Sequence, residues 1–335
     1  MTDPPPPQAE RGAGGRVSVA MATYNGAAWV GEQLASIAAQ TRPPDELVVC
    51  DDRSADGTAG LVESFAAGAP FPVRLTVNDV NLGATKNFEK AIGLCAGEVI
   101  ALADQDDVWL PHKLARLADA LAGSPQAAMA FSDAEIVDED LRPRGLRLWP
   151  CSYVGPRQLR RMRAGRTFEL LLTHNVVTGA AMAFRSARRD LLLPIPAGWV
   201  HDGWIALLLS AVADVVALDE PLIRYRQHGR QQIGAKKPTL RGQYRHARTM
   251  GRDYFRRETA NYAAALERLS AATGPPAPPE RLAKLAAKVR HYRARLRMRE
   301  VGRAARLPII LRELYAGRYF RYSINWKAIP QDIFL

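Results

Sequence analysis

The first 120 residues alternate between short apolar runs and amphipathic stretches. The apolar runs, which we expect to be strands, are residues 17–22, 46–50, 73–77 and 98–102. The stretches between them have apolar residues at helical spacing, and they are residues 29–37, 61–65 and 86–95. This β-α-β-α-β-α-β order predicts an α/β fold, with a mostly parallel sheet and helices on both faces.

Three of the predicted strands end in polar clusters. The first is followed by Thr23-Tyr24-Asn25-Gly26, the second by DDRSADG from residue 51, and the fourth by DQDD at 104–107. Ligands of open parallel sheets bind outside the carboxyl ends of the strands. Because these ends lie on one edge, we expect the three clusters to converge on one site.

The DQDD cluster holds three carboxylates within four positions. A divalent cation would neutralise their repulsion. Oxygen ligands without a neighbouring Cys or His suit Mg²⁺ or Mn²⁺, which share their coordination with substrate phosphates. The alternative is a solvated turn in which Asp104 or Asp107 caps the helix that begins near Pro111. The position at a strand end, beside two other polar strand ends, favours the cation site.

Charge divides the chain of 335 residues, whose net charge is +12, into two regions. From Lys236 onward there are 23 Lys and Arg against 7 Asp and Glu, so the first 235 residues hold 23 against 27. A hydrophobic content of 47% allows a large core and excludes wholesale disorder. We therefore predict two regions with different electrostatic roles, divided near residue 235.

Several sequence features exclude other classes. Residues 1–15 are rich in Pro and Gly and have no apolar core, so we expect a disordered tail and no signal peptide. The longest apolar stretch, 203–218, is interrupted by Asp214 and is too short to span a membrane. Three widely spaced cysteines argue against a disulfide framework and a zinc site, and for a reducing compartment.

The basic C-terminal region contains an amphipathic helix. Its apolar positions follow 3-4-3-4 spacing, and they are Leu282, Leu285, Val289, Tyr292 and Leu296. Basic amphipathic helices suit an anionic membrane surface, and we favour that partner. The alternative is that this helix packs on the rest of the protein. A nucleic-acid partner is disfavoured, because no zinc pattern or RNP motif accompanies the charge.

Four motifs resemble a known family. VSVAMATYNGAAWVGEQLASIAAQT, LVVCDDRSADGT, NLGATKNFEKAI and ALADQDDVWLPHKL are similar to the nucleotide-sugar-binding half of family-2 inverting glycosyltransferases with the GT-A fold. HNVVTGAAMAFRSA, HDGWIALL and YRQHGRQQIGA extend a weaker resemblance to about residue 235, toward rhamnosyltransferase-type members that build bacterial surface polysaccharides. The resemblance implies a Rossmann-like GT-A catalytic domain over 16–235, with a basic C-terminal α-helical appendage over 236–335.

The resemblance also implies residue roles. Asp104 and Asp106 match the DxD pair that holds the cation, and Asp106 is the better candidate for direct contact. Asp202 matches the catalytic base, although His201 precedes it where many members have an acid. The positions implied in binding the donor are Thr23, Tyr24, Asn25, Asp52, Lys86, Asp104 and His228.

Each role has a structural alternative. Tyr24 could pack at a strand end, and Asp52 could belong to a turn. Asp202 could cap the following helix. His228 could be a surface or packing residue rather than a contact of the diphosphate or the metal.

The implied activity is inverting transfer of a sugar, with rhamnose favoured, from a dTDP or UDP type donor. The acceptor would be a hydroxyl of a growing surface polysaccharide or lipid-linked glycan, used in the cytoplasm or at the inner face of the cytoplasmic membrane. The alternatives are a noncatalytic nucleotide-sugar-binding protein and a nucleic-acid-binding protein. A noncatalytic relative would be expected to lack Asp106 or Asp202, and both are present.

Overall fold

The computed structural model describes residues 15–229, 249–274, 276–324 and 328–334. The predicted tail lies almost wholly outside these residues, as does the predicted boundary near residue 235. Within the described ranges a single mixed sheet has the strand order β3-β2-β1-β4-β8-β6-β9-β5, with β7 paired to β6. The strands are β1 Val17–Thr23, β2 Glu46–Asp51, β3 Val73–Val77, β4 Val99–Asp104, β5 Val108–Trp109, β6 Ala127–Val137, β7 Pro143–Arg147, β8 Met182–Arg185 and β9 Asp214–Arg226.

The first half of the sheet is parallel, as predicted. β1 pairs with both β2 and β4, and β2 pairs with β3, all in parallel. The register sets Thr23 opposite Asp51 and Ala22 opposite Asp104. The carboxyl ends of β1, β2 and β4 therefore lie on one edge of the sheet.

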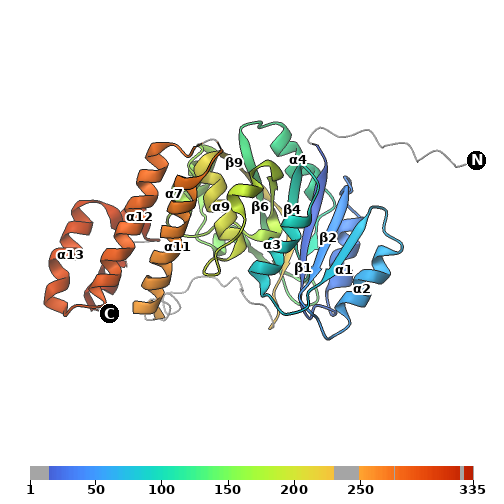
Figure 1. The fold of residues 1–335 in the computed structure, drawn as a ribbon, viewed down its shortest axis with the longest axis horizontal. Helices are drawn as coiled ribbons and strands as arrows, with labels where there is room; N and C mark the ends of the chain where they lie inside the picture. The colour runs from blue at the N-terminus through green and yellow to red at the C-terminus, as the bar shows by residue number, and fades with distance from the viewer. Residues whose placement is uncertain (1–14, 230–248, 275, 325–327, 335) are drawn as a thin grey trace, which may run out of the picture.

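Helices cover both faces of the sheet (Figure 1). Apolar residues of α1, α2 and α4 pack on one face, and those of α3 and α9 pack on the other. The helices of this region are α1 Val30–Ala38, α2 Thr58–Ala66, α3 Ala84–Leu94, α4 Lys113–Ala122, α5 Leu148–Cys151, α6 Pro156–Arg163, α7 Thr167–Leu171, α8 Arg189–Leu192 and α9 His201–Val212.

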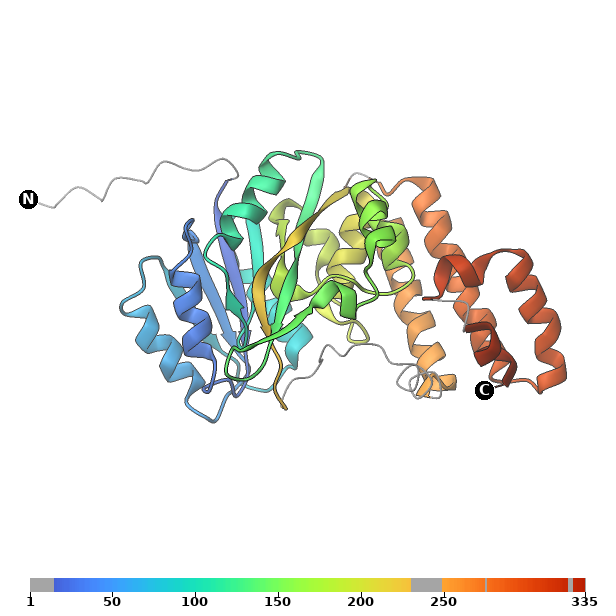
Figure 2. The same cartoon turned by 180° about the vertical axis from the view of Figure 1, so that it is seen from behind.

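The second half of the sheet mixes directions. β8 is antiparallel to both β4 and β6, while the long strands β6 and β9 are parallel to each other (Figure 2). Because β8 reverses direction between them, β4 and β6 again point the same way. The loops after β6 and β9 therefore reach the edge where β1, β2 and β4 end.

The C-terminal helices stand at the end of the molecule far from α1 and α2 (Figure 1). They are α11 Arg252–Ala271, α12 Pro279–Met298, α13 Arg303–Tyr315, α14 Arg318–Tyr322 and α15 Ala328–Phe334. Leu285, Val289 and Tyr292 of α12 are buried in the same apolar core as Trp204 of α9. The predicted helix is confirmed, but its apolar face packs on protein, so the membrane interpretation of that face is wrong.

A smaller cluster joins the last three helices to α12. Its buried apolar members are Met298, Ile310, Tyr319 and Ala328. The Arg295 guanidinium lies 2.8 Å from a carboxylate oxygen of buried Asp332. Among the helices in the described ranges, none combines the length and apolarity of a membrane span.

Candidate active site

The polar loops at the strand ends are hydrogen-bonded to one another. The Tyr24 N–H donates to Gln105 Oε1 at 2.8 Å, and Gln105 Nε2 donates to the Tyr24 carbonyl at 3.0 Å. The Asn25 N–H donates to Ser54 Oγ at 2.8 Å, and Asn25 Oδ1 accepts from the Ala55 N–H at 2.9 Å. The predicted convergence of the three clusters is confirmed.

The loop after β1 exposes one aromatic ring. Thr23 is buried, and its hydroxyl donates to Asp51 Oδ2 at 2.7 Å. Asn25 has a φ of 47°, a left-handed conformation that Asn adopts more readily than most residues. Between them, Tyr24 is 49% exposed. The alternative that Tyr24 packs at the strand end is therefore wrong, and its ring can stack on a ligand.

The Asp52 carboxylate is buried and organises the loop after β3. Its Oδ1 accepts from the Leu82 N–H at 2.7 Å and from Asn78 Nδ2 at 2.9 Å. Its Oδ2 accepts from the Gly83 N–H at 2.8 Å. Asp52 thus holds the strand-end loops together, and direct contact with a donor base stays a prediction.

The Lys86 ammonium is held by the protein itself. It lies 2.7 Å from Glu89 Oε2 and donates to the Ile195 carbonyl at 2.8 Å. These contacts direct it toward the loop before α9. Its role near the donor diphosphate or base stays a prediction.

Asp104, Asp106 and Asp202 lie close enough to share one electrostatic environment. Burial, together with the charges of Asp106 and Asp202, raises the pKa of Asp104 to about 7, against the opposing charge of Lys113. The structure therefore brings the predicted base to the predicted DxD pair, although Asp202 comes from α9 in the second half of the domain.

The loop after β9 brings His228 to the same cluster. His228 Nε2 lies 2.9 Å from Asp106 Oδ2, and its ring stacks on Trp29 with centroids 3.9 Å apart. The alternative of a surface histidine is wrong, because the side chain is only 3% exposed. Whether it touches the donor stays a prediction.

Arg226, which the sequence did not single out, locks the acidic turn. The backbone N–H of Arg226 donates to Asp107 Oδ1 at 3.1 Å, and its side-chain Nε donates to the Asp106 carbonyl at 2.8 Å. Its guanidinium also forms an ion pair with Glu32. Helix α4 has His112 at its N-cap with no side-chain cap bond, so the capping alternative for the cluster is wrong.

Lys113 is a second residue that the sequence did not reveal. Its side chain is fully buried, donates to the Ala180 carbonyl at 2.5 Å and lies 3.3 Å from the Trp109 ring centroid. Burial lowers the pKa of this amine well below its usual range, against the opposing charges of Asp107 and Asp104. The buried amine of Lys113 thus lies beside the carboxylate cluster on its core side.

The oxygen donors of the cluster fit a divalent cation that completes its coordination with substrate. Within the described ranges, no group of three or more His, Cys, Asp or Glu side chains has the arrangement of a complete metal site. Mg²⁺ and Mn²⁺ bound to nucleotides need only one or two carboxylates, with phosphates and waters in the other positions. Asp104 and Asp106 supply that number and that chemistry.

Asp202 is held by hydrogen bonds from three directions. Its Oδ1 accepts from Asn175 Nδ2 at 3.1 Å and from the N–H of Gly203, and its Oδ2 accepts from the Gly179 N–H at 3.3 Å. Val200 is the N-cap of α9, so the cap alternative is wrong. Burial raises the pKa of Asp202 to about 6, against these hydrogen bonds. A carboxylate whose pKa lies near neutral pH is suited to accept a proton.

His201 packs directly behind this carboxylate. Its ring stacks on Phe88 with centroids 4.0 Å apart, and burial lowers its pKa to about 3, which keeps it neutral. A Cβ on Gly179 would lie 2.7 Å from His201 Nε2. The small residue at 179 therefore lets the backbone N–H reach Asp202.

We expect the transfer rate to fall below pH 6. A base works in its ionised form, so kcat/KM should decrease about tenfold per pH unit below the pKa of Asp202. The measurement is a pH–rate profile at saturating Mn²⁺, because a bound cation favours ionised Asp104 and removes its titration from this range. A rate that stays constant down to pH 5 would contradict the assignment.

Comparison with known proteins identifies relatives of this chain. The family model described as glycosyl transferase family 2 matches residues 18–192. Uncharacterized protein Rv1520 of Mycobacterium tuberculosis is 27% identical over 215 residues, which are 63% of this chain and 59% of that protein. The chain thus matches less than two thirds of the length of this relative.

Two shorter matches have named activities. The dTDP-rhamnosyl transferase RfbG of Shigella flexneri is 37% identical over 106 residues, 30% of this chain and 36% of RfbG. The UDP-Glc:alpha-D-GlcNAc-diphosphoundecaprenol beta-1,3-glucosyltransferase WfgD of Escherichia coli is 34% identical over 98 residues, 29% of this chain and 38% of WfgD.

Solved structures share the fold. S. aureus TarS 1-349 in complex with UDP-GlcNAc has a TM-score of 0.57 and 16% identity, over 83% of this chain and 72% of that one. The mannosyltransferase PcManGT of Pyrobaculum calidifontis, in complex with GDP-Man and Mn²⁺, has a TM-score of 0.51 and 18% identity, over 90% and 76%. The similarity supports the GT-A fold.

Proposed function

This chain belongs to glycosyl transferase family 2, and on that premise we propose that it transfers a sugar from a nucleoside diphosphate donor with inversion. The observation that carries the proposal is that Asp202 lies close enough to Asp104 for its charge to raise the pKa of Asp104, as the charge of Asp106 does. One carboxylate is then available to the acceptor, and two to a cation on the donor phosphates. A noncatalytic binding protein would have no use for the tuned base.

Asp202 acts as the general base. Asn175 and the Gly179 backbone hold the carboxylate in place, so that it can take the proton of an acceptor hydroxyl as that oxygen attacks the anomeric carbon. A single base with direct attack inverts the configuration at this carbon. A double displacement would need a second carboxylate as nucleophile, and Asp104 and Asp106 are assigned to the cation.

Asp104 and Asp106 would hold the divalent cation, Mg²⁺ or Mn²⁺. When bound, the ion would stabilise the negative charge that develops on the departing diphosphate. His228 and Arg226 fix Asp106 for this task, through its Oδ2 and its carbonyl. Tyr24 offers its exposed ring to the nucleotide base, while Thr23, Asn25 and Asp52 shape the surrounding loops. These roles rest on the geometry and on the family membership.

The finer assignment concerns donor and acceptor. We propose a dTDP or UDP type donor with rhamnose favoured, supported by the similarity to a dTDP-rhamnosyl transferase. The proposed acceptor is a hydroxyl of a growing surface polysaccharide or lipid-linked glycan, supported by a relative whose named acceptor is a diphosphoundecaprenol glycan.

The test is calorimetric titration with a panel of nucleotide sugars, in Mn²⁺ and then in chelator. We expect one donor of the dTDP or UDP type to bind with Mn²⁺ and to bind much more weakly without it. The configuration of the product, measured by the coupling constant of its anomeric proton, then tests inversion. Absence of binding to every donor would overturn the proposed function.

We also propose that α13 contacts an anionic membrane surface. Leu307, Leu311 and Tyr315 lie along one face of this helix and are 56%, 55% and 98% exposed. Exposed Arg303 and Arg312 belong to the same helix. Exposed apolar side chains beside cations are typical of interfacial helices, and an acceptor at the inner face of the cytoplasmic membrane would make such contact useful.

Replacing Leu307 and Leu311 together with Glu should abolish binding to vesicles rich in phosphatidylglycerol. The two side chains are exposed, so the fold should survive the change, while buried apolar area and charge attraction are both lost. Cosedimentation with vesicles measures the effect, and Leu61→Glu, which alters an exposed leucine of α2, is the matched control. Equal binding of the double variant and the wild type would contradict this contact.

A further inference from the structure

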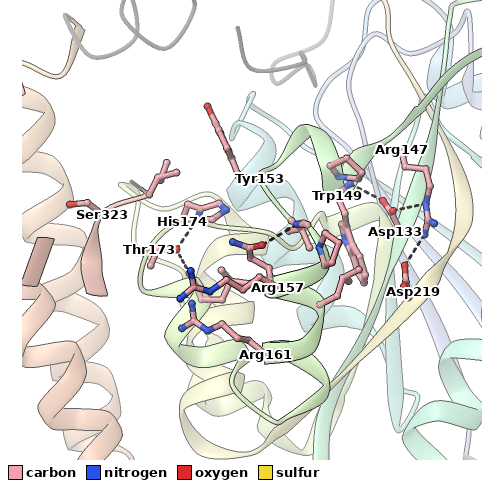
Figure 3. Close-up of a pocket in the computed structure, with 18 of the residues that line it drawn as sticks. Asp133, Arg147, Trp149, Tyr153, Arg157, Arg161, Thr173, His174, Asp219 and Ser323 are labelled. Carbon is pink, nitrogen blue, oxygen red and sulfur yellow. Dashed lines mark hydrogen bonds and ion pairs between the residues drawn. The ribbon is translucent and has the colours of Figure 1, made fainter. Parts of the chain in front are cut away.

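A cavity of about 660 Å³ lies between α5, α6, the loop after α7 and the end of α14 (Figure 3). Its walls include Trp149, Tyr153, His174 and Phe320. This volume is in the range of small-molecule sites. Neither the base nor the DxD pair lines it, so the proposed donor site does not account for it.

The carboxylates of the cavity are already neutralised. Asp133 is bound by Arg147 Nε at 2.7 Å. Asp219 lies 3.2 Å from Arg147 Nη2 and 3.1 Å from Arg163 Nη2. The acidic side chains on this side of the cavity thus have cationic partners within the protein.

Arg157 and Arg161, by contrast, have no such partner among the residues that the structure describes. Neither forms an ion pair with a carboxylate in the described part of the chain, and the nearby Glu169 is bound by Lys284 at 2.7 Å. Figure 3 shows the two arginines on α6, near Thr173 and His174. Like charges four residues apart destabilise a helix, so an anion bound between them would stabilise the structure.

The surroundings of Arg161 agree with this excess of positive charge. Burial and the charges of Arg166 and Arg157 lower its pKa, and its Nε is buried without a hydrogen-bond partner among the described residues. The helix dipole favours a cation at Arg161 in the last turn of α6, but disfavours Arg157 in the first turn. The helix dipole alone therefore does not explain why both Arg157 and Arg161 occur on this helix.

Two consecutive residues, His174 and Asn175, connect the cavity to the base. His174 lines the cavity, with its Nε2 2.9 Å from the Ser152 carbonyl. The next residue, Asn175, donates to Asp202 Oδ1 at 3.1 Å. A sugar bound beside Asn175 can thus present a hydroxyl to Asp202 while a group attached to it occupies the cavity.

The rim suits an amphipathic ligand. Tyr153 has a φ of 60°, a conformation that costs free energy for a residue of this size and that presents its ring at the cavity. Phe320 and Ile324, from the C-terminal helical region, are 68% and 43% exposed at the cavity edge.

We propose that this cavity binds the phosphate or diphosphate group at the reducing end of a lipid-linked acceptor, with Arg157 and Arg161 as its ligands. The proposal rests on the proposed function, since it needs an acceptor at Asp202. Guanidinium groups bind phosphate oxygens in bidentate geometry, and Phe320 and Ile324 would contact the first part of the lipid chain.

The test titrates the full chain with farnesyl diphosphate, farnesol and inorganic pyrophosphate, in EDTA so that no cation at Asp106 can bind the diphosphate. We expect farnesyl diphosphate to bind more tightly than either other probe. The Arg157→Gln/Arg161→Gln variant should bind it at least about tenfold more weakly, through the loss of charge-assisted hydrogen bonds. Arg160→Gln, an exposed arginine of the same helix that does not line the cavity, should bind it like the wild type.

Each other result overturns the proposal in a defined way. Equal affinity for pyrophosphate would mean an anion site with no preference for a lipid-linked group. Equal binding by the double variant and the wild type would exclude the two arginines as ligands, and the exposed Arg157→Gln single variant checks this if the double variant is unstable. The donor titration in Mn²⁺ is a separate experiment. Absence of farnesyl diphosphate binding in EDTA would leave the proposed transferase activity unaffected, whereas absence of donor binding in Mn²⁺ would overturn the activity itself.

Discussion

Replacing Asp202 with Asn is expected to lower kcat by about 10²–10⁴-fold, the range that a positioned general base contributes. The amide cannot take the proton of the acceptor hydroxyl. Its one carbonyl oxygen can still accept from Asn175 Nδ2 and the Gly203 N–H, and only the longer bond from the Gly179 N–H at 3.3 Å is lost, so the loop around Asn175 should keep its structure. The measurement is the single-turnover rate of transfer at saturating donor and acceptor.

Donor affinity separates loss of the base from loss of the site. Asp202→Asn should bind the donor in Mn²⁺ as the wild type does, because the proposed ligands of the cation are Asp104 and Asp106. Asp190→Asn, which removes an exposed carboxylate of α8, should leave both binding and rate unchanged. A rate for Asp202→Asn within a few-fold of the wild type would assign the proton transfer to another group.

The parallel half of the sheet could be predicted because its signals are local. The apolar runs ending at Thr23, Asp51 and Asp104 are buried on both faces, and each stops where polar loop residues begin. The direction of β8 between β4 and β6 had no such signal. It depends on pairings between segments far apart in the chain, such as Ile100 opposite Phe184.

The acidic residues of the site could also be predicted, but not the groups that hold them. Asp104 and Asp106 stand in a recognisable cluster at a strand end. Lys113 and Arg226 look like ordinary charged residues in the sequence, and only the tertiary structure buries them beside those carboxylates. Amphipathic spacing likewise could not distinguish a membrane from protein as the partner of α12, because both bury the same apolar face.

Replacing Asp106 with Asn should weaken donor binding in Mn²⁺ at least about tenfold and reduce transfer by about 10²–10³-fold, as the loss of one electrostatic contact to the developing charge does elsewhere. In chelator the variant and the wild type should bind the donor equally weakly. This equality is the decisive comparison, because it assigns the difference to the cation. Calorimetry in both conditions measures it.

Stability gives an independent check on the same variant. Asp106 adds to the repulsion that raises the pKa of Asp104, so its neutralisation should leave the melting temperature in chelator unchanged or higher. The Asn oxygen can still meet His228 Nε2, which preserves the link to the loop after β9. Asp119→Asn, on the exposed side of α4, removes the same charge away from the cluster and should alter neither quantity. If Asp106→Asn instead melted well below the wild type without any metal present, Asp106 would be a structural residue, and the cation would have to be assigned to other ligands.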